Sequence, residues 1–71
     1  MKPGTVCRVR TDVDPLLPWA TPGSIVEIVG DNRLLPTARL LFGAYRDEGR
    51  AQYAEREGYL IFDPEELEEI E

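Results

Sequence analysis

The stretch Gly58-Tyr59-Leu60-Ile61-Phe62-Asp63-Pro64-Glu65-Glu66-Leu67-Glu68-Glu69-Ile70-Glu71 carries the clearest structural signals in this chain of 71 residues. It begins with Tyr59–Phe62, a short run of the aromatic and branched residues that strands favour. The strand ends at Asp63, which is a good N-cap for a single helical turn, and Pro64 suits the first position of that turn. We therefore expect a strand followed by one helical turn.

After this turn the apolar residues are Leu67 and Ile70, which lie three positions apart. A helical turn would place both on one face and against the body of the protein, whereas an extended segment would place them on opposite faces. We expect both to pack in a short strand or turn near 67–70. The neighbouring acidic side chains are expected to face water: Glu65, Glu66, Glu68 and Glu69.

Three further segments have the character of strands, and turn signals separate them. They are Thr5–Arg10, Ser24–Val29 between Pro22-Gly23 and Gly30-Asp31-Asn32, and Ala38–Phe42 before Gly43. Alternation along each segment identifies an inward face. The expected inward residues are Cys7, Val9, Val26, Ile28, Ala38, Leu40 and Phe42, and Phe42→Ala is expected to be strongly destabilising.

Two of the segments between the expected strands are predicted to be loops, and the apolar residues of the first loop have two possible roles. Thr11–Gly23 is rich in proline and is predicted to be a loop, in which Leu16, Leu17 and Trp19 either cover an open end of the core or present Trp19 to a partner. Asp31–Thr37 is predicted to be a second loop.

The segment from Arg46 to Glu57 is ambiguous. It could form a short helix that ends before Gly58, or the tip of a hairpin around Asp47-Glu48-Gly49. Only Tyr53 gives it an apolar anchor, so an irregular excursion between strands is favoured, with one helical turn possible.

Composition limits the possible functions. The length predicts a single domain over residues 1–71, and 42% hydrophobic residues are typical of a globular chain. One cysteine and no histidine exclude an intrachain disulfide and a zinc site of the usual ligands, and they remove the commonest general base. We found no catalytic motif, so we expect neither an enzyme nor a cofactor or metal. No apolar run approaches the roughly 20 residues that span a bilayer, and no signal peptide is evident, so a cytoplasmic location is expected.

Charge is unevenly distributed. The segments 1–30 and 31–62 each sum to zero, and 63–71 carries the whole net charge of −6. This acidic balance makes direct binding of nucleic acid unfavourable, because such binding depends on excess positive charge.

Two motifs resemble those of small bacterial SH3-like barrels. The first is Pro3-Gly4-Thr5-Val6-Cys7-Arg8-Val9 followed by Pro22-Gly23-Ser24-Ile25-Val26-Glu27-Ile28-Val29, which is similar to the glycine and valine rhythm of SH3-like and KOW-like domains. The second is Phe62-Asp63-Pro64-Glu65-Glu66-Leu67-Glu68, which is similar to the ending of CarS-like and, more loosely, PsaE-like domains. The resemblance covers nearly the whole chain. It implies an all-β fold, a small five-stranded SH3-like barrel with one short helical turn before the last strand.

Domains of this class commonly dock on a larger protein or regulate it, and this is the function we expect. Aromatic and arginine side chains dominate the energetics of interfaces. The partner would be another protein, with the chain itself a monomer or weak dimer and no membrane involved. The candidate anchors are Trp19, Tyr45, Arg46, Arg50, Tyr53, Arg56 and Tyr59.

Two other functions compete with this one. The CarS-like resemblance implies an acidic inhibitor or antirepressor that imitates nucleic acid toward a DNA-binding protein. The carboxylates in place of phosphates would be those of Glu65, Glu66, Glu68, Glu69 and Glu71, with Asp12 and Asp14 as further candidates. The KOW-like resemblance implies direct nucleic-acid binding by a face that carries Arg8, Arg10, Arg39 and Arg46.

Overall fold

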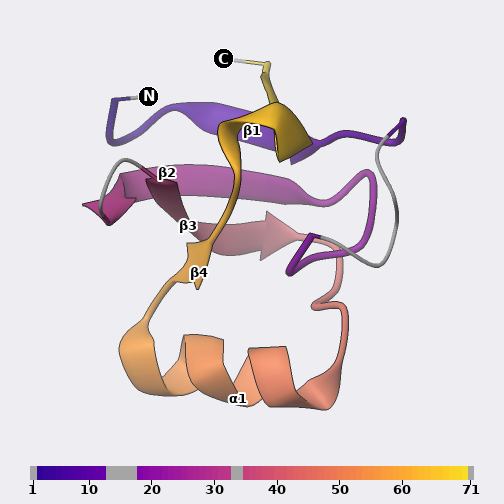
Figure 1. Ribbon diagram of the computed structural model, residues 1–71, viewed down its shortest axis with the longest axis vertical. Helices are drawn as coiled ribbons and strands as arrows, with labels where there is room; N and C mark the ends of the chain where they lie inside the picture. The colour runs from indigo at the N-terminus through magenta and orange to yellow at the C-terminus, as the bar shows by residue number, and fades with distance from the viewer. Residues whose placement is uncertain (1, 13–17, 33–34, 71) are drawn as a thin grey trace.

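A long antiparallel hairpin forms the centre of the structure, a computed structural model that describes residues 2–12, 18–32 and 35–70 (Figure 1). The hairpin consists of β2 (Ile25–Asn32) and β3 (Leu35–Phe42). Within the described ranges, three shorter strands complete one antiparallel sheet in the order β4-β3-β2-β1-β5. These are β1 (Val6–Val9), β4 (Leu60–Ile61) and β5 (Leu67–Glu69).

The expected all-β fold of five strands is confirmed, and a turn of 3-10 helix at Pro64–Glu66 precedes the last strand. The two edge strands, β4 and β5, do not pair with each other, so the sheet is not closed. The predicted strand positions are close to those observed.

The core lies on the inner face of the sheet. Strand register aligns Cys7 with Val26 and Val26 with Leu40, and it aligns Ala38 with both Ile28 and Leu60. Burial raises the pKa of the Cys7 thiol. The predictions for the inner residues of β1 and β2 are confirmed, and Leu40 packs partly buried against the same cluster. The largest fully buried side chains of this core are Phe62, Ile28, Leu60, Val9 and Val26.

Phe42 does not lie in the core, and the prediction that it does is wrong. Its side chain is 75% exposed. The cause is an irregularity in the hairpin: Val26 pairs with Leu40, but Ile25 pairs with Phe42, so Leu41 is an extra residue in β3. A bulge of this kind reverses the alternation, and Phe42 therefore projects from the opposite face of the sheet.

The predicted loop at Asp31–Thr37 is largely strand. β2 continues to Asn32, and β3 begins at Leu35. A second shift of register lies between Ile28 and Gly30, which lets the hairpin continue past the glycine that had indicated a strand end. Pro36 is tolerated in β3, and its carbonyl accepts a hydrogen bond from the Phe62 amide at 3.0 Å.

A capping box fixes the turn before β5. The Asp63 carboxylate accepts from the Glu65 amide at 2.9 Å, and the Glu66 carboxylate accepts from the Asp63 amide at 2.7 Å. The predicted cap and the predicted position of Pro64 are both confirmed. The chain then becomes extended.

Because β5 is a strand, its side chains alternate between faces. Leu67 is buried as predicted, whereas Ile70, three positions later, is 45% exposed. The prediction that both pack is therefore wrong for Ile70, and the extended alternative describes this segment.

Removing the capping box should have a moderate effect. We expect Asp63→Ala to lower the free energy of unfolding by about 1 kcal/mol, because the turn loses its cap. Glu66→Gln should be nearly neutral, because glutamine keeps an oxygen that can accept from the Asp63 amide. Thermal denaturation followed by circular dichroism measures both. Equal melting temperatures for Asp63→Ala and the unmodified protein would show that the cap does not stabilise the fold.

The segment after β3 forms the helix α1 (Glu48–Glu57) instead of an irregular excursion or a hairpin tip. The Asp47 side chain caps its start by accepting from the Arg50 amide at 2.9 Å. Gly58 ends it with φ of 84°, and its amide donates to the Ala54 carbonyl at 2.7 Å. The favoured sequence interpretation underestimated α1 because Tyr53 packs on Trp19, which lies far away in the sequence.

A tight contact marks the end of β3. Gly43 has φ of 118°, and a Cβ atom there would overlap the Ser24 hydroxyl oxygen and lie 2.9 Å from the Ser24 Cα. Ser24 is itself buried, and its hydroxyl oxygen is 3.0 Å from that of Thr21 and 3.4 Å from the Ala44 amide. Gly43 thus lets the chain leave the sheet close to the start of β2.

Candidate protein-interaction surfaces

Three aromatic side chains from separate segments meet beside α1, and two arginines of the helix lie against them. The Tyr53 ring is edge-on to Trp19 at a centroid separation of 5.0 Å and edge-on to Tyr59 at 6.2 Å. The Arg50 guanidinium is 5.2 Å from the Trp19 centroid, and that of Arg56 is 5.4 Å from the Tyr53 centroid. Both contact types are attractive at these separations. We call these five residues the aromatic cluster.

Backbone contacts hold the start of α1 against the segment that carries Trp19. Ala20 and Tyr45 form an antiparallel bridge, and the Arg46 amide donates to the Trp19 carbonyl at 2.9 Å. Tyr45 and Arg46 therefore lie next to the aromatic cluster. Of the seven predicted anchors, five thus form the aromatic cluster, and the other two, Tyr45 and Arg46, lie beside it.

Hydrogen bonds organise the charged groups of this region. Asp47 accepts from the Arg50 guanidinium at 2.6 Å as well as from its amide, and the amide bond is the main reason that the pKa of Asp47 is lowered. This lowered pKa makes the cap stabilising above the unfolded-state pKa of aspartate, and the stabilisation is lost as the pH falls through the folded-state value. A hydrogen bond to Tyr59, followed by burial, raises the pKa of Tyr53.

The cluster is both packed and accessible. Trp19 is partly buried and packs against the core, while Leu16 and Leu17 lie outside the described residues. All three aromatic side chains remain partly exposed. The Arg56 side chain is 69% exposed, and its nearest carboxylate contact is Glu57 at 3.8 Å. A partner could therefore reach both rings and guanidinium groups.

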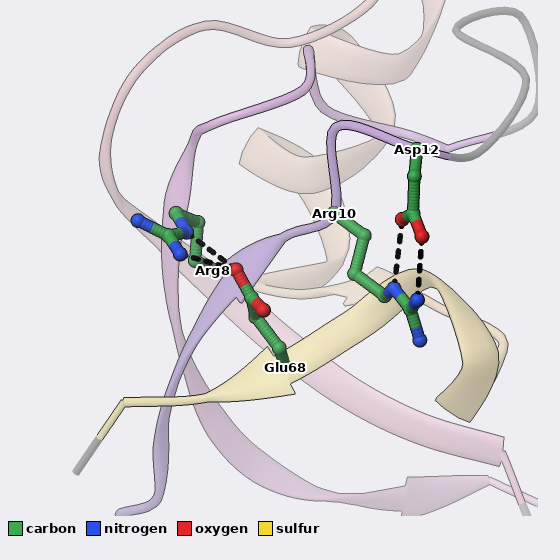
Figure 2. Close-up of polar contacts among 4 residues, drawn as sticks. All are labelled: Arg8, Arg10, Asp12 and Glu68. Carbon is green, nitrogen blue, oxygen red and sulfur yellow. Dashed lines mark hydrogen bonds and ion pairs between the residues drawn. The ribbon is translucent and has the colours of Figure 1, made fainter.

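The predicted acidic residues lie at the other end of the molecule. In Figure 1 the C-terminal end and α1 are at opposite ends of the longest axis. Glu65 and Glu69 are exposed, as predicted, but Glu66 and Glu68 are half-buried and occupied by contacts within the chain. Glu66 closes the capping box, and Glu68 accepts from Arg8 Nε at 2.6 Å across the β1–β5 pair. Figure 2 shows this ion pair at the sheet edge.

The arginines considered for nucleic-acid binding are all engaged by carboxylates. Arg10 makes a bidentate contact with Asp12, in which Nε donates to Oδ1 at 2.9 Å and Nη2 donates to Oδ2 at 2.6 Å (Figure 2). These contacts neutralise the positive charges that phosphates would need. The pairs are Arg8–Glu68, Arg10–Asp12, Arg39–Glu27 and Arg46–Asp47.

Sequence reasoning missed the outer face of the sheet as a candidate surface. Phe42 is exposed on this face, and Ile25, its partner in the register, is half-buried. The neighbouring Leu41 is exposed as well. Phe42 is exposed because of the bulge at Leu41. The residues of β3 alone do not predict this bulge, because it depends on how β3 pairs with β2.

Comparison with protein-family models, with curated proteins and with solved structures finds no significant match to this chain. Among the described residues there is no group of three or more side chains arranged to hold a metal ion. None of the described helices has the length and apolarity needed to cross a membrane.

Proposed function

We propose that this protein is a non-enzymatic docking module of the SH3-like kind, which binds a larger protein through the aromatic cluster and the neighbouring Tyr45 and Arg46. The observation that carries the proposal is the convergence of three partly exposed aromatic rings and two guanidinium groups on one surface. Tyrosine, tryptophan and arginine are the residue types that most often dominate the binding energy of interfaces.

Preorganisation also supports this surface. Tyr53 is held between Trp19 and Tyr59, and Arg56 rests on the Tyr53 ring, so binding would not need to order these side chains from a freely rotating state. Fixing such side chains costs about 0.5–1.5 kcal/mol each in an unordered surface. The turn of 3-10 helix before the last strand supports the SH3-like part of the proposal, since the resemblance in sequence rests partly on that turn.

We expect Arg56→Ala to weaken binding of the partner by about fivefold or more, because Arg56 is the exposed guanidinium of the cluster. The protein is immobilised, the partner is captured from the cells that express it, and the affinity of the purified partner is then measured by calorimetry. Gln52→Ala is the matched control, since Gln52 is exposed on the same helix and takes part in none of the ring and cation–π contacts that define the cluster. Equal losses for the two variants, or none for Arg56→Ala, would rule out this surface.

Salt distinguishes this function from the acidic decoy. Binding through aromatic rings should change little between about 0.05 and 0.5 M salt, whereas carboxylates that replace phosphates would lose affinity steeply over that range. Glu71 and Asp14 lie outside the described residues. Among the other four candidate glutamates, the contacts of Glu66 and Glu68 within the chain leave Glu65 and Glu69 as the exposed carboxylates, and this favours the docking module.

A further inference from the structure

β5 is an edge strand, and the side of it that faces away from β1 is open. Two hydrogen bonds mark the ends of its pairing with β1: the Arg10 amide donates to the Glu66 carbonyl at 2.8 Å, and the Ile70 amide donates to the Val6 carbonyl at 3.0 Å. Backbone groups alternate in direction along a strand, so those of Leu67 and Glu69 point away from β1.

These outward groups are only partly used. The Leu67 amide donates to the Pro64 carbonyl, within the turn of 3-10 helix. Over the described ranges, no strand or bridge pairs with the outward groups of Glu69. An open strand edge can pair with a strand of another molecule, and natural proteins usually protect such an edge.

Glu69 is a charged residue on the inner face of the sheet at this edge. The register aligns it with Cys7, which is fully buried, and alternation places it on the same face as Leu67, which is 5% exposed. After burial, the charge of Glu69 is the next cause of the raised pKa of the Cys7 thiol, so the carboxylate is close to the core.

Glu69 is nevertheless exposed, and it takes part in none of the ion pairs between described residues. Glu68 has the opposite arrangement, because it projects from the outer face and accepts from Arg8 Nε at 2.6 Å (Figure 2). A strand added beside β5 would therefore meet a compensated charge on the outer face and an uncompensated one on the inner face.

We propose that Glu69 prevents β5 from pairing with β5 of a second copy, and so keeps this edge of the sheet open. Antiparallel pairing of the outward groups can align Leu67 with Glu69 of the second copy. Each Glu69 carboxylate would then lie beside a leucine on the inner face of a continuous sheet, and it would lose water without gaining a cation.

Other alignments are also unfavourable. Glu69 aligned with Glu69 places like charges directly opposite each other. Leu67 aligned with Leu67 would bring Glu69 opposite Glu65, which belongs to the turn of 3-10 helix and cannot extend the ladder. Glu69 therefore opposes each of these ways of joining two copies through β5.

The other edge strand, β4, has no comparable charge and differs in length. It consists of Leu60 and Ile61 alone. So short an edge strand offers few backbone groups to a second strand, and this is itself a form of protection. β5 is thus the edge at which one side chain can decide whether strands pair.

Sedimentation equilibrium over a wide range of protein concentration tests the proposal. We expect Glu69→Val to strengthen self-association about tenfold or more relative to the unmodified protein, because a strand-favouring apolar side chain replaces the carboxylate. Glu55→Val is the matched control, since it makes the same change at an exposed position of α1, which has no strand edge. It should leave self-association unchanged.

Glu69→Pro separates the role of the strand edge from that of the charge. It removes the carboxylate together with the outward amide that a second strand would need, so it should not strengthen self-association. Proline is acceptable at this position because the amide of Glu69 is not used in pairing with β1. Circular dichroism should show that all three variants are folded, since Glu69 and Glu55 are exposed.

Hydrogen exchange locates the contact. In Glu69→Val the amide of residue 69 should become protected as the protein concentration rises, and this measurement decides alone if Glu69→Pro does not fold. Self-association of Glu69→Val no stronger than that of the unmodified protein overturns the proposal. Equal strengthening by Glu55→Val or Glu69→Pro overturns it too, because overall charge or hydrophobicity would then be the cause. β5 and the aromatic cluster are separate, so partner binding should be the same in Glu69→Val.

Discussion

Phe62→Ala should destabilise the protein by about 3–5 kcal/mol, the range for removing a buried phenyl ring. Phe62 is 1% exposed and is the largest fully buried side chain among the described residues. It follows β4 directly, and its amide is bonded to Pro36, so the backbone cannot easily move to fill the cavity. A chain of this length has a total stability of roughly 4–10 kcal/mol. A large fraction of the variant should therefore be unfolded at moderate temperature.

Phe42→Ala is the matched control for this prediction, because it removes the same ring from an exposed position. We expect it to change the free energy of unfolding by about 0.5 kcal/mol or less. Urea denaturation followed by circular dichroism measures both variants. A larger loss for Phe42→Ala than for Phe62→Ala would mean that the bulge at Leu41 is misplaced and that Phe42 belongs to the core after all.

Gly43→Ala should have the next largest effect, a loss of about 2–4 kcal/mol. Two costs combine: alanine is strained at φ of 118°, and its Cβ would lie 2.6 Å from the Ser24 Cβ and 2.9 Å from the Ser24 Cα. Ser24 cannot move aside without disturbing its contacts with Thr21 and Ala44 at the start of β2. The change therefore affects the two central strands together.

Gly4→Ala separates these two costs. Gly4 also has a positive φ, 91°, but a Cβ there would have no neighbour within 4 Å. We expect it to cost about 1 kcal/mol from backbone strain alone. Thermal denaturation of the two variants gives the difference, which measures the collision with Ser24. If both variants melt at the same temperature, the close approach of Gly43 to β2 is not significant for stability.

Structural features that depend only on neighbouring residues could be predicted from the sequence. The capping box at Asp63 and Glu66 and the alternation of Cys7 and Val9 could be predicted from neighbouring residues, and both are observed. The side of the sheet on which Phe42 lies could not be predicted in this way, because it depends on the register between β3 and β2. A single unpaired residue, Leu41, decides it.

The helix and the candidate site were harder to predict for a related reason. Asp47 and Gly58 indicate the ends of α1, but the sequence shows only Tyr53 as its apolar anchor. The neighbours of Tyr53 are Trp19 and Tyr59, and the first of these lies far away in the chain. Aromatic residues could therefore be proposed as anchors individually, whereas their assembly with Arg50 and Arg56 required the fold.

The pairing of β1 with β5 determines when the sheet can be completed during synthesis. Arg8 and its partner Glu68 are 60 residues apart, so β1 emerges from the ribosome long before the strand that will cover its outer edge. At roughly 5–20 residues per second this interval is about 3–12 s, in which β1 can pair with β2 but not with β5. The last strand also closes the longest loop and so contributes most to a high contact order, which slows folding. Until β5 arrives, the nascent chain has an unprotected strand edge at β1, and this is the period in which a chaperone or another nascent chain could pair with it.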